Sequence, residues 1–287
     1  MRAALALLLT LTPAAAAAGD HPRVVSLDYC ADQFVLALAD PEQILGVSVQ
    51  ADDVHSVLRD QAEGHQQVRD AAEDVLALGP DLVIRSYGGD ARARALYDRF
   101  GVEVFDLGWA GDFDGVRASI RRTAAALGHP ERGEALIAEM DTKLAEAANG
   151  PRLSALYLTP SGATTGSGTL VAELLEAANF DNAGAAGGAA GWRTLPLERL
   201  AAQEPDLVIA AFFDEDAAAR DSWSVSRHPV FRRLIGETPS VTIDGAKTTC
   251  GAWFLADAAL EARRGANAIY ARTAGRPPAR KQEGGGR

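Results

Sequence analysis

Apolar residues along the chain gather in short uninterrupted runs that alternate with longer segments of helical periodicity. The runs lie at residues 23–27, 44–48, 81–84 and 102–106 in the first half, and at 153–158, 206–210 and 240–244 in the second. Runs that are apolar at nearly every position are typical of strands in a parallel sheet covered on both faces by helices. The pattern therefore predicts strands that alternate with helices throughout the chain.

The two halves of the chain carry the same signal. The pentapeptide PDLVI occurs at residues 80–84 and again at 205–209, each time after a short amphipathic segment and before a polar loop. Chance repetition of a common helix-to-strand turn is the alternative, but the flanking segments match in length as well. The repeat predicts an α/β fold of two Rossmann-like lobes with mainly parallel sheets, each lobe having its own core.

A long helical stretch lies between the two copies. Its first apolar stripe comprises Phe113, Val116, Ile120, Ala124 and Leu127, and Gly128 is suited to end that helix. Pro130 is suited to begin a second helix. We expect one helical connector at residues 112–150 that joins an N-terminal lobe at 23–111 to a C-terminal lobe at 151–275. A single rigid connector predicts only small lobe motion.

The first residues have the layout of a secretory signal peptide, residues 1–18. Arg2 precedes an apolar run too short to span a bilayer, and the alanines that follow offer a cleavage site ending at Ala18. An N-terminal anchor helix is the alternative. The cleavage position has no cysteine, which favours a free periplasmic protein over a lipoprotein. Residues 276–287 lack an apolar face and are expected to form a disordered tail.

Charge excludes some partners. The formal net charge is −11, whereas binding to nucleic acid or to an anionic membrane requires neutralisation of phosphates by Lys and Arg. We therefore expect no nucleic-acid partner.

Aromatic residues concentrate in or beside the loops that follow predicted strands. All four tryptophans do so, and Tyr29 and Tyr87 join them; the tryptophans are Trp109, Trp192, Trp223 and Trp253. In open α/β sheets ligands bind beyond the carboxyl ends of the strands, so two facing lobes would form a cleft there. Large aromatic surfaces in such a cleft suit a bulky, partly apolar ligand. The alternative is that one or two of these rings fill the core.

Catalytic and metal-binding patterns are absent from the sequence. The five histidines show no paired metal spacing, and no nucleophile motif or Cys-His pairing is present. The sequence therefore predicts a binding protein with no metal site and no cofactor of its own. An exported two-lobe enzyme is the alternative function, and it would need an acid/base or nucleophile set in the cleft.

Three segments resemble a known family. Residues 23–48 are similar to its opening strand-helix-strand, residues 76–89 to its second signature, and residues 163–183 to the opening of its second lobe. The family is the class III periplasmic substrate-binding proteins of ABC importers, which have two α/β lobes joined by a rigid helix and carry vitamin B12, ferric siderophores or haem. The likeness is greatest to the cobalamin-binding branch.

The resemblance implies a partner and a docking surface. Members of the family deliver their ligand to an ABC permease dimer with its ATPase, and dock through one surface glutamate on each lobe. Glu73 and Glu198 each lie seven residues before a PDLVI proline and so occupy equivalent places. Equivalent carboxylates suit a two-fold symmetric permease. Two merely exposed helix residues are the alternative.

The resemblance also implies a cleft and a ligand class. Candidate ligand-binding residues are Cys30, Arg85, Tyr87, Trp109, Thr165, Trp192, Arg193, Trp223, Cys250 and Trp253. A corrinoid is the favoured metal chelate. Arg85 and Tyr87 stand where the vitamin B12 protein has an indole, and Arg85, Arg193 and Arg227 would suit the oxygens of a ferric siderophore or haem propionates instead. A carrier that serves a sensor rather than transport is a further alternative.

The two cysteines fall in loops of opposite lobes that both face the implied cleft. A disulfide between Cys30 and Cys250 would fix the separation of the lobes in an oxidising compartment. Two free thiols are the alternative, one of which would touch the cobalt or iron of the ligand.

Overall fold

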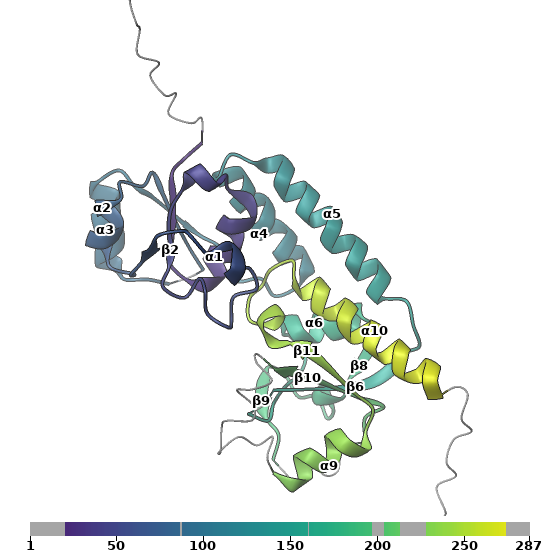
Figure 1. The fold of residues 1–287 in the computed structure, drawn as a ribbon. Helices are drawn as coiled ribbons and strands as arrows, with labels where there is room; N and C mark the ends of the chain where they lie inside the picture. The colour runs from purple at the N-terminus through teal and green to yellow at the C-terminus, as the bar shows by residue number, and fades with distance from the viewer. Residues whose placement is uncertain (1–20, 87, 160, 197–203, 213–227, 274–287) are drawn as a thin grey trace, which may run out of the picture.

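The chain folds around two parallel sheets with helices between and around them (Figure 1), as seen in a computed structural model that describes residues 21–86, 88–159, 161–196, 204–212 and 228–273. The N-terminal sheet has the strand order β3-β2-β1-β4-β5 and every neighbouring pair is parallel. Its strands are β1 (Val24–Ser26), β2 (Ile44–Ser48), β3 (Gln67–Val68), β4 (Leu82–Arg85) and β5 (Glu103–Asp106). The helices of this lobe are α1 (Tyr29–Leu38), α2 (Ala72–Ala77) and α3 (Ala91–Arg99), with short 3-10 helices η1 (Pro41–Gln43) and η2 (Arg59–Gln61).

The C-terminal sheet repeats this design with the strand order β11-β10-β6-β8, again all parallel. Its strands are β6 (Leu153–Leu158), β8 (Phe180–Asn182), β10 (Leu207–Phe212) and β11 (Ser240–Asp244). A small antiparallel pair, β7 (Ala163–Thr165) with β9 (Trp192–Thr194), lies beside it. The helices are α6 (Leu170–Ala177), α9 (Pro229–Glu237) and α10 (Leu255–Thr273), with η3 (Ala183–Ala185) and η5 (Gly245–Thr248). The predicted fold class, α/β with mainly parallel sheets in two lobes, is confirmed.

The repeated pentapeptide forms an interior strand in each sheet, which accounts for its apolar composition. β4 lies between β1 and β5, and β10 lies between β6 and β11. The aspartate before each strand has the same task. Asp81 accepts a hydrogen bond from the backbone N–H of Arg23 at 2.9 Å, and Asp206 accepts one from the N–H of Ser154 at 2.9 Å. In both lobes this carboxylate fixes the beginning of the neighbouring strand, and Arg23 adds a side-chain ion pair.

Two antiparallel helices, α4 (Phe113–Ala126) and α5 (Pro130–Ala147), occupy the predicted connector. The Asp112 side chain caps α4 by accepting from the Gly115 N–H at 2.7 Å, and Pro130 takes the first position of α5. The predicted apolar stripe of α4 is buried, with Val116, Ile120 and Ala124 all at 0 % exposure.

The interior differs from the expected pair of separate cores. The largest apolar cluster is continuous from Phe34 and Ile84 in the N-terminal lobe, through Met140 of α5, to Tyr157 and Ile209 in the C-terminal lobe. The reason is that α4, α5, α6 and α10 form a helical layer between the sheets, visible in Figure 1, and each sheet turns one face toward it. Smaller clusters cover the outer faces of the two sheets.

Several predicted segments lie outside the described residues, namely the signal peptide at 1–18, the tail at 276–287, and the residues Tyr87, Glu198, Trp223 and Arg227. Among the helices that the structure does describe, none has both the length and the apolar composition required to cross a membrane.

Candidate functional site: a pocket between the two sheets

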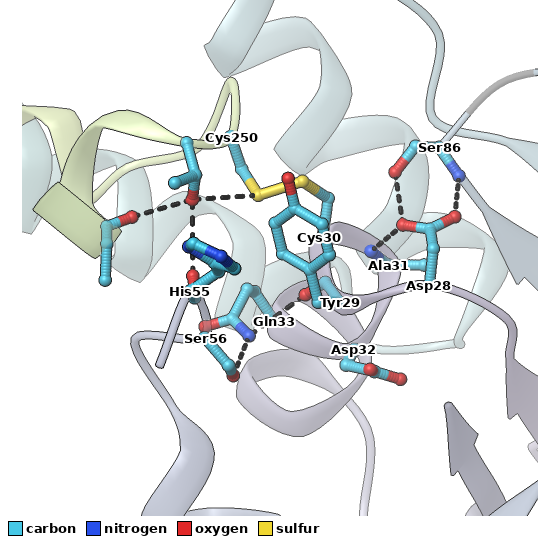
Figure 2. Close-up of a disulfide and its surroundings, with 12 residues drawn as sticks. Asp28, Tyr29, Cys30, Ala31, Asp32, Gln33, His55, Ser56, Ser86 and Cys250 are labelled. Atoms are coloured by element: carbon cyan, nitrogen blue, oxygen red, sulfur yellow. Dashed lines mark hydrogen bonds between the residues drawn. A yellow bond between two sulfur atoms is a disulfide. The ribbon is translucent and has the colours of Figure 1, made fainter. Parts of the chain in front are cut away.

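The ends of β1 and β4 are tied together by one side chain. Asp28 caps α1 by accepting from the Ala31 N–H at 2.9 Å, and its carboxylate also accepts from the N–H of Ser86 at 2.7 Å and from the Ser86 hydroxyl. Figure 2 shows this arrangement at the edge of the site. Asp28 thereby holds the first turn of α1 and the loop after β4 in a fixed relation, at the carboxyl edge of the sheet.

A disulfide joins that edge to the C-terminal lobe. Cys30, in the first turn of α1, is bonded to Cys250, which follows η5, and the two residues are 220 positions apart with Cα atoms 5.7 Å from each other. Figure 2 shows the bond beside the Tyr29 ring. A second link between the lobes runs alongside, since the Thr249 hydroxyl donates to the backbone oxygen of His55 at 3.3 Å. The alternative of two free thiols is not what the structure shows.

The loop that carries His55 is held by Gln33 of α1. The Gln33 amide nitrogen donates to the Ser56 hydroxyl at 2.6 Å, and its oxygen accepts from the Leu58 N–H at 2.8 Å. The His55 ring then lies 6.2 Å from the Tyr29 ring, centroid to centroid. Figure 2 places both rings next to the disulfide. A buried amide thus positions an aromatic pair beside the disulfide.

These links border a pocket of about 350 Å³ whose walls come from both lobes. That volume is at the lower end for small-molecule sites. Lining residues from the N-terminal lobe include Tyr29, Cys30, Phe34, Ser86, Leu107 and Trp109; from the C-terminal lobe they include Leu170, Trp192, Thr248, Thr249 and Cys250. Trp109 is 80 % exposed and Trp192 is 51 % exposed, so each lobe contributes one exposed indole to the pocket wall.

The polar groups of the pocket wall are neutral. Ser86, Ser119, Thr169, Thr248 and Thr249 supply hydroxyl groups, whereas no charged side chain of the described residues lines the pocket. Hydroxyls donate and accept hydrogen bonds without favouring either sign of charge. The wall therefore suits a ligand that is apolar over most of its surface and neutral at its polar groups.

The Trp192 indole is supported from behind. The ring of Tyr157 packs edge-on against it, with centroids 5.8 Å apart and an interplanar angle of 71°. The Tyr157 hydroxyl lies 3.0 Å from the Thr248 hydroxyl, and burial raises the pKa of Tyr157 to about 12. Tyr157 is thus a neutral side chain that connects two residues of the pocket wall.

The two predicted arginines that the structure describes are engaged elsewhere. Arg85 is 6 % exposed and donates from Nε to Asp106 Oδ1 at 2.7 Å; it lines a neighbouring cavity of about 260 Å³ instead of the main pocket. Burial alone would raise the pKa of Asp106, but Arg85 and Arg94 together lower it. Arg193 donates to the backbone oxygen of Gly184 at 2.6 Å. Neither guanidinium lines the main pocket.

Four of the ten candidate ligand-binding residues line the pocket, namely Cys30, Trp109, Trp192 and Cys250. Thr165 does not line the pocket; it is fully buried in β7, where its hydroxyl bonds to Thr169. Trp253 does not line it either; it is 8 % exposed and packs edge-on against Phe34 at 5.4 Å. Trp192 begins strand β9, where it pairs with Thr165. Glu73 is exposed on α2, as docking requires.

Sequence reasoning missed several wall residues. Phe34, Ser119 and Leu170 lie within helices or at their ends, and their contribution depends on how α1, α4 and α6 pack. Leu107 directly follows β5, so position at a strand end was an available signal for this residue.

The family comparison agrees with this arrangement of two parallel sheets and a pocket between the lobes. Residues 24–231 match the family model described as periplasmic binding protein. The chain belongs to the periplasmic binding protein family. Its members are binding proteins, which agrees with the prediction that the chain is not an enzyme. No curated protein sequence matches the chain.

Solved structures of binding proteins share the fold of this periplasmic binding protein. The periplasmic heme-binding protein RhuT from Roseiflexus sp. RS-1 in apo form has a TM-score of 0.65 and 22 % identity, over 86 % of this chain and 99 % of RhuT. The periplasmic heme-binding protein HutB of Vibrio cholerae has a TM-score of 0.66 and 20 % identity, over 86 % of this chain and 98 % of HutB. The periplasmic vitamin B12-binding protein BtuF of Vibrio cholerae has a TM-score of 0.64 and 16 % identity, over 87 % of this chain and 98 % of BtuF. At these identities the likeness concerns the fold.

Proposed function

We propose that this protein is the periplasmic substrate-binding component of an ABC importer and that its ligand is a corrinoid. The observation that carries the proposal is the composition of the pocket wall: two exposed indoles, a phenol and several neutral hydroxyls, with no charged side chain among the described residues. A corrin ring is large, flat and edged with neutral amides. Indole faces suit the ring, and hydroxyls suit the amides.

Anionic chelates fit this wall less well. Ferric siderophores and haem present carboxylates or catecholate oxygens, which proteins usually pair with arginine. Here Arg85 is paired with Asp106 and Arg193 with a backbone oxygen. Withdrawing Arg85 would leave Asp106 with a single arginine partner, Arg94.

Haem is the second candidate ligand. RhuT and HutB, which share the fold, are named as heme-binding proteins. Within the pocket, Tyr29 offers a phenol oxygen beside the His55 ring, and phenolate is a known iron ligand. The two candidates differ in charge and in the need for an axial protein ligand, so they are separable by experiment.

The pocket holds only part of such a ligand. Its volume is about 350 Å³ and Trp109 remains 80 % exposed at its edge. The rest of the ligand would lie against the exposed indoles and face the permease. Glu73 on α2 and Glu198 are the proposed contacts with the permease.

Isothermal titration calorimetry tests the proposal. Cyanocobalamin, cobinamide, haemin and a ferric catecholate siderophore are each titrated into the protein, and we expect one-to-one binding of the two corrinoids to be tightest. Tighter binding of haemin, with loss on Tyr29→Phe, would replace the corrinoid by haem. Absence of binding by all four chelates would refute a metal-chelate carrier.

Variants of the two exposed indoles test whether the ligand binds in this pocket. Trp109→Ala and Trp192→Ala each remove an exposed indole of the pocket wall, for which about 2 kcal/mol, or roughly thirty-fold in Kd, is expected. Phe100→Ala is the control because Phe100 is 65 % exposed and lies outside the pocket. Equal corrinoid affinity in all three variants would show that the ligand binds elsewhere.

A further inference from the structure

A second group of chemically competent side chains lies away from the ligand pocket. His21, Asp40 and His129 each offer a ligand atom, and these three atoms lie within 4.8 Å of one another; the described residues contain no other such group. The two imidazole rings have centroids 4.3 Å apart, and His129 Nε2 is 3.4 Å from Asp40 Oδ2.

The group is assembled at the far end of the N-terminal lobe. His21 precedes β1, whereas the pocket residues Tyr29 and Cys30 follow the other end of that strand. Similarly, α4 begins close to the pocket residue Ala110, whereas His129 follows the opposite end of α4, in the turn to α5. Figure 1 shows the described chain entering this lobe beside the turn between α4 and α5. The group therefore has no part in the ligand pocket.

A glycine makes room for one of the rings. Gly128 has a φ of +84°, and a Cβ added there would lie 2.2 Å from Nδ1 of His21. The His21 ring thus lies directly against bare backbone, in a place that any other residue at position 128 would obstruct. The same glycine ends α4 and turns the chain so that His129 follows at the beginning of α5.

Each of the other two side chains has a hydrogen-bond partner. Gln43 Oε1 lies 2.6 Å from His129 Nε2, while the Gln43 amide nitrogen donates to the backbone oxygens of Pro22 and Leu127, both at 3.1 Å. Arg132 donates to Asp40 Oδ1, which leaves Oδ2 directed at His129. A partner such as Arg132 fixes the orientation of a carboxylate ligand in a metal site, whereas Gln43 occupies the His129 nitrogen that a cation would take.

We propose that His21, Asp40 and His129 form a site for a divalent cation of the zinc class, with a fourth position open to water. Two imidazoles and one carboxylate make a borderline donor set that Zn²⁺ accepts in tetrahedral geometry. Bonds of about 2.0–2.1 Å would bring the ligand atoms to about 3.4 Å from each other. The partly exposed His21 and Asp40 can close that gap by side-chain rotation. On binding through Nε2, His129 gives up its hydrogen bond to Gln43 Oε1 and its proton moves to Nδ1.

Such a cation would bind the segment before β1 to the end of α1 and to the helical connector. The charge of Arg132, which contacts Asp40, opposes the cation and limits affinity. We therefore expect binding that stabilises the fold measurably at excess zinc without being required for folding.

The test uses the full protein stripped of metal by a chelator, with Zn²⁺ alone as the probe. We expect one zinc per chain by calorimetry and a zinc-dependent rise in melting temperature, with no such effect from Mg²⁺. His21→Gln, Asp40→Asn and His129→Gln should each weaken binding at least about ten-fold. His65→Gln is the control because His65 lies outside the group.

Asp40 and His129 also occupy the N-cap positions of η1 and α5, so their variants are melted without zinc to establish that they fold. The criterion is the zinc-dependent increment and not the melting temperature itself. His21→Gln, which changes a residue before the first strand, provides a variant with little risk of misfolding. Absence of a zinc effect on the parent protein would overturn the proposal. So would unchanged zinc affinity in both Asp40→Asn and His129→Gln, because the metal would then be held elsewhere.

Discussion

At the scale of single residues, Asp32 shows how the polar interior beneath the pocket is built. Its side chain is fully buried and accepts from the Ser48 N–H at 2.9 Å, from the Ser48 hydroxyl at 2.6 Å and from the Ser26 hydroxyl. These bonds join β1, β2 and α1. Burial raises the pKa of Asp32 to about 6, although the serine bonds act in the opposite direction.

This pKa predicts a pH dependence of stability. The folded protein holds the Asp32 proton more tightly than the unfolded chain does, so the stabilising contribution of protonated Asp32 is complete below about pH 4. This contribution is lost as pH rises through about 6, and the total loss in the free energy of unfolding is about 3 kcal/mol. Asp32→Asn keeps a neutral side chain at all pH values, so its melting temperature relative to the parent should increase from pH 4 to pH 7.

The exposed Asp52 supplies the control for that measurement, because Asp52→Asn changes the net charge equally without touching the interior. A difference between parent and Asp32→Asn that stays constant from pH 4 to pH 7 would show that Asp32 remains ionised throughout this range.

Residue identity alone does not separate wall from core. The four tryptophans share the same position after predicted strands, yet Trp109 is 80 % exposed while Trp253 is 8 % exposed. What distinguishes them is the neighbour: Trp253 packs edge-on against Phe34, which belongs to α1 and meets it only in the folded chain, and against the adjacent Phe254. The arginines were ambiguous for the same reason, because the pairing of Arg85 with Asp106 depends on β4 and β5 being adjacent.

At the scale of elements, the contact between α4 and α5 depends on Gly133. A Cβ at this position would lie 2.6 Å from Cβ of Ala124, far closer than two carbon atoms tolerate. The bare backbone allows the two helices to approach closely enough for α5 to become part of the layer between the sheets. A glycine in the interior of a helix is otherwise unfavourable.

Gly133→Ala should therefore destabilise the protein by about 1 kcal/mol, because overpacking of about 1–3 kcal/mol outweighs the gain in helix propensity. Gly236→Ala in α9 is the matched control: no atom lies within 4 Å of its added Cβ, so it should be neutral or stabilising. Urea unfolding of both variants measures the difference. Stabilisation by Gly133→Ala would show that the helices have room to separate.

Elements with strong local signals were predictable. The seven apolar runs became β1, β2, β4, β5, β6, β10 and β11, and the connector helices begin and end at the expected residues. The strands β3, β7, β8 and β9 were not predicted. They have two or three residues each, and they are strands only because a neighbouring strand is present to pair with them.

At the scale of the whole molecule, two features restrain the lobes. The apolar cluster is continuous across the helical layer, and the disulfide joins the lobes at the pocket. Both support the prediction that the lobes move little when a ligand binds. The sequence predicted the two halves but not the continuity, since helix packing between sheets leaves no local pattern. His21 and His129 likewise meet only in three dimensions.

The disulfide should contribute strongly to stability. It closes a loop of 220 residues, for which chain-entropy arguments give at most about 5 kcal/mol. A Cys30→Ser, Cys250→Ser double variant should melt well below the parent, and reductant should lower the melting temperature of the parent alone. Alkylation of two thiols in the unreduced parent protein, seen by mass spectrometry, would show that the bond is absent.

The central claim is that a corrinoid binds between the two lobes, and a crystal structure with cyanocobalamin tests it most directly. The account predicts the ligand in the pocket beside the disulfide, in contact with Trp109 and Trp192, with the two sheets in nearly the arrangement of the ligand-free protein. Cyanocobalamin bound on another surface, or a pocket that stays empty at saturating ligand, would contradict it.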